Sequence, residues 1–199
     1  MQLVDRLPTL DSILARWRVD LGGDFTAYRN HCYRVANFCL ALGDDGAETR
    51  DKLSIAVAFH DLGIWSAHTY DYLAPSRALA RAWLEETSRV EWCGEIEAMI
   101  ELHHKIRSAP STSGRLVERF RQADWIDVSR GVLRFGSPSR DVARVLAVFP
   151  NAGFHRLLAA LTLWRMKTHP FNPLPMLHPT PKRRTGRWIC ILIQPRSST

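Results

Sequence analysis

The chain has no long uninterrupted apolar run, and this absence excludes one class of protein at the start. None of its 199 residues fall in an apolar stretch of about 18, the length that a membrane-spanning helix needs. The first residues, Met1 to Arg6, do not join a basic region to an apolar one, so we expect no signal peptide. We therefore expect a cytoplasmic protein without a membrane partner.

Cysteine is scarce, and its few positions are unpaired. The four cysteines are Cys32, Cys39, Cys93 and Cys190, and no two of them form a Cys-x-x-Cys pair. Cys32 and Cys39 lie seven residues apart in one expected helix, too far apart for a disulfide unless the helix bends. This pattern argues against a zinc-finger type of site and favours reduced, mostly buried thiols.

Acidic residues are absent from the C-terminal end, and this absence explains most of the net charge of +7. Residues 178–199 hold five basic residues and no acidic one, whereas residues 1–177 hold 22 basic and 20 acidic residues. Since binding to a phosphate backbone needs clustered positive charge, a nucleic-acid partner is not expected of the main domain. We predict one domain over 1–177 and a basic, disordered tail over 178–199. The alternative for the tail is a strand or partner-binding peptide around Trp188 to Ile193.

No segment alternates polar and apolar residues with a period of two, and the chain has no internal repeat. Apolar residues recur instead at helical spacing, so the predicted fold class is all-α. Helices are expected over about 8–17, 24–42, 47–62, 75–87 and 88–105, after Gly114, and over 141–149 and 152–167. Asp24 is the expected N-cap of the second helix, Ser88 and Glu91 form a possible capping box, and 64–74 is expected to be a loop.

Four of these helices each carry a metal-binding type of residue on an otherwise apolar face. These residues are His31, His60 with Asp61 beside it, His103 with His104 beside it, and Asp124. A single histidine on such a face is usually a hydrogen-bonded core residue, but a buried carboxylate needs a partner or a cation. One divalent cation held by two histidines and two aspartates satisfies the whole set. These ligands suit Mn, Fe, Co, Ni, Zn or Mg without choosing among them.

The order of these residues resembles that of the HD-domain superfamily of metal-dependent phosphohydrolases. The matching metal ligands would be His31, His60, Asp61 and Asp124. The segment Ala-Phe-His60-Asp61-Leu-Gly is similar to the end of the family's central helix. Glu-Leu-His103-His104-Lys is similar to its histidine-rich element, and Ala123-Asp124 to the start of its final metal helix. The resemblance covers about residues 24–130 and implies a single-domain helical bundle with a central metal.

The resemblance also implies an activity, the hydrolysis of a phosphomonoester or anhydride of a small phosphorylated molecule such as a nucleotide. Asp61 is then both a metal ligand and the residue that orients water. His103 or His104 would protonate the leaving group or bind a phosphate oxygen, with a core position for one and a surface position for the other as the alternative. Lys105 and Arg34 are candidate phosphate-binding residues, and solvent exposure is the alternative for each.

Departures from the family pattern narrow this hypothesis. The cyclic-dinucleotide branch has a lysine where this chain has Ile64 and a Gly-Tyr-Pro element where it has residues 105–108, so that branch is not expected. Tyr72 stands where two-metal members often have a histidine, so we expect one metal and doubt a second. His68 and Asp71 would be substitute ligands or solvent-exposed residues. Asp127 would orient a ligand or form a salt bridge at a helix end.

Two other functions remain open from the sequence. One is a non-catalytic metal- or nucleotide-binding regulatory module on the HD fold, although such modules usually lose metal ligands. The other is an RNA- or DNA-interacting protein, for which the basic tail is the only reason. The sequence does not determine the substrate, the metal or the oligomeric state.

Overall fold

A computed structural model describes residues 2–43, 46–172 and 176, and every regular element in them is helical, as the sequence predicted. The α-helices are α1 (Pro8–Arg16), α2 (Arg18–Leu21), α3 (Phe25–Ala41), α4 (Ala47–Phe59), α5 (Gly63–Ser66), α6 (Leu73–Glu86), α7 (Cys93–Leu102), α8 (Arg115–Val128), α9 (Ser139–Val148) and α10 (Phe154–Thr168). Short 3-10 segments are η1 (Gly22–Asp24), η2 (Val90–Trp92) and η3 (Ser111–Ser113).

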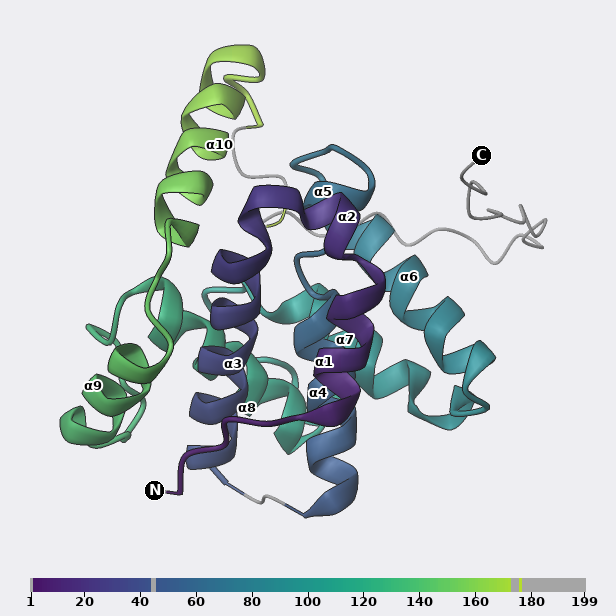
Figure 1. The fold of residues 1–199 in the computed structure, drawn as a ribbon, viewed down its shortest axis with the longest axis vertical. Coiled ribbons are helices and arrows are strands. Elements are labelled where there is room, and N and C mark those ends of the chain that lie inside the picture. The colour runs from purple at the N-terminus through teal and green to yellow at the C-terminus, as the bar shows by residue number, and fades with distance from the viewer. Residues whose placement is uncertain (1, 44–45, 173–175, 177–199) are drawn as a thin grey trace.

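Helix α3 lies at the centre of the bundle, where it packs against α4, α8 and α9 (Figure 1). Its residues are buried almost without interruption from Ala27 to Cys39. Helix α4 is similar at its C-terminal end, where Leu53 to Phe59 are all buried. A helix surrounded by other helices is apolar on several faces. Polar residues on these two helices are therefore enclosed in the core, where they need one another or a ligand as partners.

The N-terminal segment is fixed to the central helix α3 by two of its side chains. The Asn37 carboxamide accepts a hydrogen bond from the Val4 N–H at 2.8 Å and donates one to the Val4 carbonyl at 2.8 Å. Nearby, the Tyr33 hydroxyl accepts from the Leu7 N–H at 3.0 Å. These bonds satisfy backbone groups that would otherwise be buried without partners, since Val4 and Leu7 both lie in the core.

Helix α4 ends at Phe59, three residues before the predicted end. His60, Asp61 and Leu62 form a tight turn into α5, and Gly63 makes this turn possible. A Cβ atom at position 63 would lie 2.5 Å from the Tyr72 carbonyl oxygen, so only glycine fits. The Gly63 N–H donates to the Ser76 hydroxyl at 2.9 Å. The His-Asp turn is thereby packed directly on the start of α6.

Three local predictions were wrong. The 64–74 segment is not only a loop, since it contains most of α5 and the start of α6. Asp24 makes no capping bond and instead accepts from Trp65 Nε1 at 3.1 Å. Ser88 has a positive φ of 55°, and η2 separates it from α7, which begins at Cys93.

Helix α10 extends away from the rest of the bundle (Figure 1), and Phe154 at its start is the one residue in it that is fully buried. No helix in the described part of the chain is both long and apolar enough to cross a membrane. Cys32, Cys39 and Cys93 are free and buried, as predicted. The predicted basic tail over 178–199, with Cys190, lies outside the described residues.

Candidate metal centre

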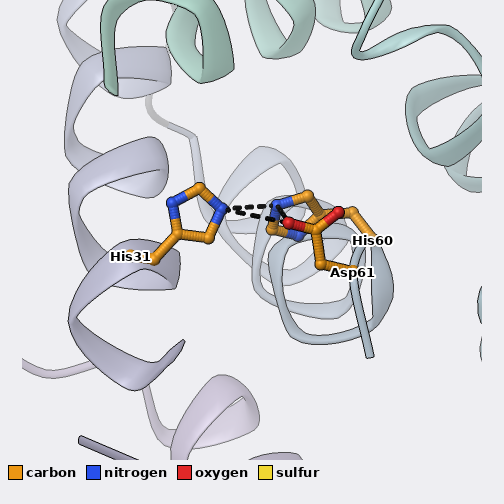
Figure 2. A group of neighbouring side chains, drawn as sticks. All are labelled: His31, His60 and Asp61. Atoms are coloured by element: carbon orange, nitrogen blue, oxygen red, sulfur yellow. Dashed lines mark hydrogen bonds and ion pairs between the residues drawn. The ribbon is translucent and has the colours of Figure 1, made fainter. Parts of the chain in front are cut away.

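The structure brings the polar residues of four helices to one point in the core. His31 comes from α3, while His60 and Asp61 form the turn after α4. His103 and His104 follow α7, and Asp124 lies in α8. Figure 2 shows His31 directed across the core toward His60 and Asp61. The side chains of all these residues are at most 2% exposed, except that of His104, which is 17% exposed.

Each of three histidine rings uses its Nδ1 atom to bond an acceptor outside the cluster. The His60 Nδ1 lies 2.8 Å from the Val57 carbonyl, and the His103 Nδ1 lies 2.7 Å from the Ile100 carbonyl. The His31 Nδ1 lies 2.6 Å from a carboxylate oxygen of Asp127. Because these partners can only accept, each Nδ1 carries the proton, and in the neutral ring Nε2 is left with a lone pair. Histidine ligands of metals are oriented in this way.

The Nε2 atoms of His31 and His60 face each other at 2.8 Å. Two lone pairs cannot lie this close unless a proton or a cation lies between them. Asp61 Oδ2 is 3.6 Å from both nitrogens. Asp124 Oδ1 is 3.8 Å from the His31 nitrogen and 3.9 Å from the His60 nitrogen. Each of the two nitrogens thus lies at most 3.9 Å from a carboxylate oxygen of Asp61 and from one of Asp124, and the ligating atoms of His31, His60 and Asp61 are close enough together to hold a metal ion.

A second group of potential ligands shares Asp61 with the first. The ligating atoms of Asp61, His103 and His104 all lie within 4.8 Å of one another, as do those of His31, His60 and Asp61. Asp61 Oδ1 is 3.4 Å from His103 Nε2. The Tyr72 hydroxyl, however, hydrogen-bonds His104 Nε2. Tyr72 therefore occupies one of the nitrogens that a second cation would use.

Several buried polar atoms at the centre have no hydrogen-bond partner among the described residues. They are Asp61 Oδ1, His103 Nε2 and both carboxylate oxygens of Asp124. Buried polar atoms are nearly always satisfied by protein or water, and a buried carboxylate without a partner is strongly unfavourable. The donor set fits a divalent ion, because nitrogen and oxygen ligands of this kind suit the metals predicted from the sequence.

Burial shifts the ionisation of these residues in opposite directions. Burial raises the pKa of Asp124 to about 7 and lowers that of His60 to about 3. For Asp61, burial acts to raise the pKa, but the nearby His60 and His103 outweigh it and hold the pKa well below its usual value. At neutral pH His60 is therefore a neutral imidazole and Asp61 a carboxylate, which are the states in which both bind metals.

Arg34 lies elsewhere than the sequence suggested. Its side chain is 1% exposed, and its Nε and Nη2 donate to the two carboxylate oxygens of Asp127 at 2.5 and 3.0 Å. A third nitrogen, Nη1, donates to the Phe149 carbonyl at 3.1 Å. The predictions of a phosphate-binding or solvent-exposed Arg34 were both wrong, because the side chain is buried in the core and paired there with the Asp127 carboxylate.

Asp127 combines the two roles predicted for it, because it bonds the His31 ring and also forms a salt bridge with Arg34 near the end of α8. Its carboxylate bonds both Arg34 and the His31 ring, so it orients a candidate ligand from outside the cluster. Burial acts to raise its pKa, but the bonds from His31 and Arg34 hold the pKa far below the usual value. A permanently ionised Asp127 keeps the His31 proton on Nδ1 and directs Nε2 toward the centre.

The other predicted residues lie at the edge of the cluster or away from it. Lys105 directly follows His104, and its Nζ donates to the Met176 carbonyl at 3.2 Å. Its predicted phosphate contact stays a prediction. His68 and Asp71 are solvent-exposed, the second of the two alternatives for them. Sequence reasoning missed Phe154, whose ring stacks on that of His31 with centroids 4.0 Å apart. No helical stripe pointed to that contact.

Comparisons of the chain with protein-family models, curated proteins and solved structures find no match.

Proposed function

We propose that the chain is a metal-dependent phosphohydrolase of the HD type, acting on a phosphomonoester or anhydride of a small molecule. The observation that carries the proposal is the buried cluster of His31, His60, Asp61 and Asp124, in which Asp61 Oδ1 and both Asp124 carboxylate oxygens have no hydrogen-bond partner among the described residues. Buried polar atoms without partners lower the stability of a core, and a bound cation would offset this cost by coordinating them. These residues also match the order of ligands in the HD superfamily.

His31, His60, Asp61 and Asp124 would hold a divalent ion there, and the bound ion would polarise a phosphoryl oxygen and lower the pKa of water. Asp61 contributes a carboxylate with one oxygen toward each group of histidines, so it can orient an attacking water while holding the ion. His104 is the residue of the cluster that reaches solvent, and we assign it the contact with substrate phosphate. Tyr72 fixes the orientation of the His104 ring through its hydroxyl.

His103 holds a proton more readily than His104. Burial lowers the pKa of both rings, but the Asp61 carboxylate, whose Oδ1 lies 3.4 Å from His103 Nε2, and the charge of Asp124 raise that of His103 above its usual value. The pKa of His104 stays well below its usual value because of burial and the nearby His103. His103 is therefore the assigned proton donor to a leaving group, and His104 the neutral hydrogen-bonding residue.

The experiment combines metal analysis with a phosphatase and nucleotide panel. Asp61→Ala should abolish both metal binding and hydrolysis, because it removes the ligand common to the two groups. Asp71→Ala is the matched control, since Asp71 is an exposed aspartate ten residues away in the chain. Circular dichroism checks that each variant is folded.

The possible outcomes separate the two functions on this fold. Full turnover by metal-free Asp61→Ala protein would refute the proposal. Stoichiometric metal binding without hydrolysis of any panel member would instead support the regulatory module that the sequence left open.

A further inference from the structure

Helix α10 is apolar on two opposite faces, and the rest of the described chain covers one of them. Leu158 and Leu161 on the inner face are partly buried and pack against the core. Leu163, Trp164 and Met166 point elsewhere and are between 51% and 60% exposed. A helix that is apolar all round is normally buried. The second apolar face of α10 therefore calls for a partner from outside the described residues.

Helical spacing places positive charge on this second face. Arg156, Leu163 and Lys167 recur at i, i+7 and i+11, so they form one stripe along the helix. At 3.6 residues per turn, Trp164 and Met166 lie about 80° to either side of that stripe. All five residues are exposed, and we call them the outer face of α10. This face therefore combines large apolar side chains with a positive charge near each end of the helix.

The basic character extends beyond the helix. Residues 129–172 hold seven basic residues and one acidic residue, whereas residues 1–128 hold 15 basic and 19 acidic residues. Asp141 is the last acidic residue of the sequence. Helices α9 and α10, which lie in the basic region, both pack against α3 and lie on the same side of it (Figure 1). The nearly even charge balance over 1–177 thus hides two regions of opposite sign.

The C-terminal end of α10 adds a further apolar side chain. Helix α10 extends away from the bundle toward this end (Figure 1). There Arg165 Nε donates to the Asn172 carbonyl at 3.2 Å, which turns the chain back at the end of the helix. Phe171 lies in this turn and is 99% exposed. An aromatic ring is thereby presented to solvent next to the outer face.

The composition of the outer face distinguishes among possible partners. A nucleic acid would use the positive charge and stack a base on Trp164, but it would leave Leu163 and Met166 uncovered. A second copy of the same face would cover the apolar side chains, but it would bring basic residues together, since α10 contains no acidic residue. An anionic lipid surface matches both properties, because amphipathic helices that lie in the headgroup region combine Trp, Leu or Phe with Lys or Arg.

We infer that the outer face of α10, together with Phe171, docks peripherally on the surface of an anionic lipid bilayer. The apolar side chains enter the boundary between headgroups and acyl chains, while Arg156 and Lys167 lie at the anionic headgroups. Such docking needs no membrane-spanning helix, so the sequence argument against a spanning segment does not bear on it. The inference is independent of the proposed hydrolysis, because none of these residues belongs to the metal centre.

The test is co-sedimentation of the full-length protein with two kinds of vesicle, phosphatidylcholine alone and phosphatidylcholine with phosphatidylglycerol. Wild-type protein should bind the anionic vesicles at least about 10-fold more tightly, since each basic residue near such a surface contributes about fivefold. Trp164→Ser/Phe171→Ser should weaken that binding about 10-fold or more, because two apolar side chains no longer leave water. Val19→Ser/Val90→Ser is the matched control, since both valines are exposed and lie outside α10.

A second pair of variants tests the charge. Arg156→Gln/Lys167→Gln should weaken binding to the anionic vesicles about 10-fold or more and change binding to phosphatidylcholine by less than about 2-fold. Arg6→Gln/Arg115→Gln removes the same charge from exposed positions elsewhere and is the matched control. Circular dichroism checks that all four variants are folded. Higher salt should weaken wild-type binding, because it screens exposed charges.

Every other outcome overturns the inference in a way that identifies the alternative. Equal binding to the two kinds of vesicle, or binding to neither, removes the anionic bilayer as the partner. Anionic binding that neither α10 variant weakens would assign the interaction to other residues, such as the basic residues of 178–199. A thymidine oligonucleotide that binds when vesicles do not would favour nucleic acid. A dimer that Trp164→Ser/Phe171→Ser dissociates, without vesicle binding, would favour a second copy.

Discussion

The fold treats the two sides of the His31 ring in opposite ways. On the Nδ1 side, Asp127 bonds the ring and is itself bonded twice by Arg34, which also reaches a backbone carbonyl. On the Nε2 side, the ring faces another imidazole nitrogen and two carboxylates that share no hydrogen bond with it. We call these the anchored side and the open side.

The difference separates the residues that stabilise the fold from those that would hold the proposed cation. Every charge on the anchored side has a partner, so that side contributes to folding without a ligand. The open side holds two carboxylates and polar atoms without hydrogen-bond partners, which oppose folding in the protein alone, and the proposed cation would remove this cost. Local conflict with the rules of core packing is expected at functional sites. Substitutions on the two sides should therefore change stability in opposite directions.

The largest effect is expected on the anchored side. Asp127→Ala should lower the free energy of unfolding by about 3–5 kcal/mol, because it leaves the buried Arg34 charge without its counter-charge. Urea denaturation of chelator-treated protein, followed by circular dichroism, measures the loss. The exposed Asp71→Ala variant should change stability by less than about 0.5 kcal/mol. Equal stability of the two variants would mean that the anchored side is not a stabilising unit.

The open side should respond with the opposite sign. Asp124→Asn should raise the free energy of unfolding of metal-free protein by about 1–3 kcal/mol, because it replaces a buried carboxylate that has no hydrogen-bond partner among the described residues with an uncharged amide of similar shape. Hundredfold excess of Mn²⁺ over its Kd should stabilise wild-type protein by about 2.7 kcal/mol and leave the variant unchanged. A less stable metal-free Asp124→Asn protein would remove the distinction between the two sides.

The same pair of proteins gives a pH dependence. Burial raises the pKa of Asp124 from its ordinary 3.8 to about 7, so the folded wild-type protein binds a proton that the unfolded chain releases. The Asp124 carboxyl therefore makes wild-type protein lose stability as pH rises between about 4 and about 7. The advantage of Asp124→Asn should be small at the acid end of this window and complete above it. Denaturation midpoints of both chelated proteins across the window measure the difference.

The smallest effect is expected where Glu118 of α8 holds the loop between α7 and η3. Glu118 accepts from Arg121 and from the Ala109 N–H, and these bonds, with that to Arg121 the largest influence, lower its pKa. Glu118→Gln should lower stability by about 1 kcal/mol at neutral pH. Because the bonds that lower the pKa stabilise only the ionised carboxylate, the loss of stability should disappear as pH falls below the ordinary pKa of a glutamate. Glu48→Gln, at a 67% exposed side chain, is the matched control and should show neither effect.

The sequence predicted the residues of the open side well, because the face of a helix on which a residue lies depends only on its spacing from its neighbours in the chain. His31, His60 and His103 each share a stripe with apolar neighbours, and a stripe on a packed helix points inward whatever the topology. The all-α class followed from the same periodicity. The convergence of these residues at one point could be inferred because buried polar groups need one another.

The anchored side could not be predicted from the sequence, because it depends on which helices touch. Arg34 was assigned to phosphate or solvent, since arginine is rarely buried unless it is paired. Its partner Asp127 lies 93 residues away in the chain, and no local pattern joins the two. Phe154 was missed for the same reason. Its helix is mostly exposed, and only its first residue enters the core.

The contact between Gly63 and the Tyr72 carbonyl has a consequence for anyone who redesigns this protein. The turn that carries His60 and Asp61 fits against the backbone of the segment that leads into α6, with no space for a methyl group between them. That segment also presents the Tyr72 hydroxyl to His104. The turn and the 67–72 segment are therefore fitted to each other, and a redesign that replaces only one of them would misalign His60, Asp61 and His104.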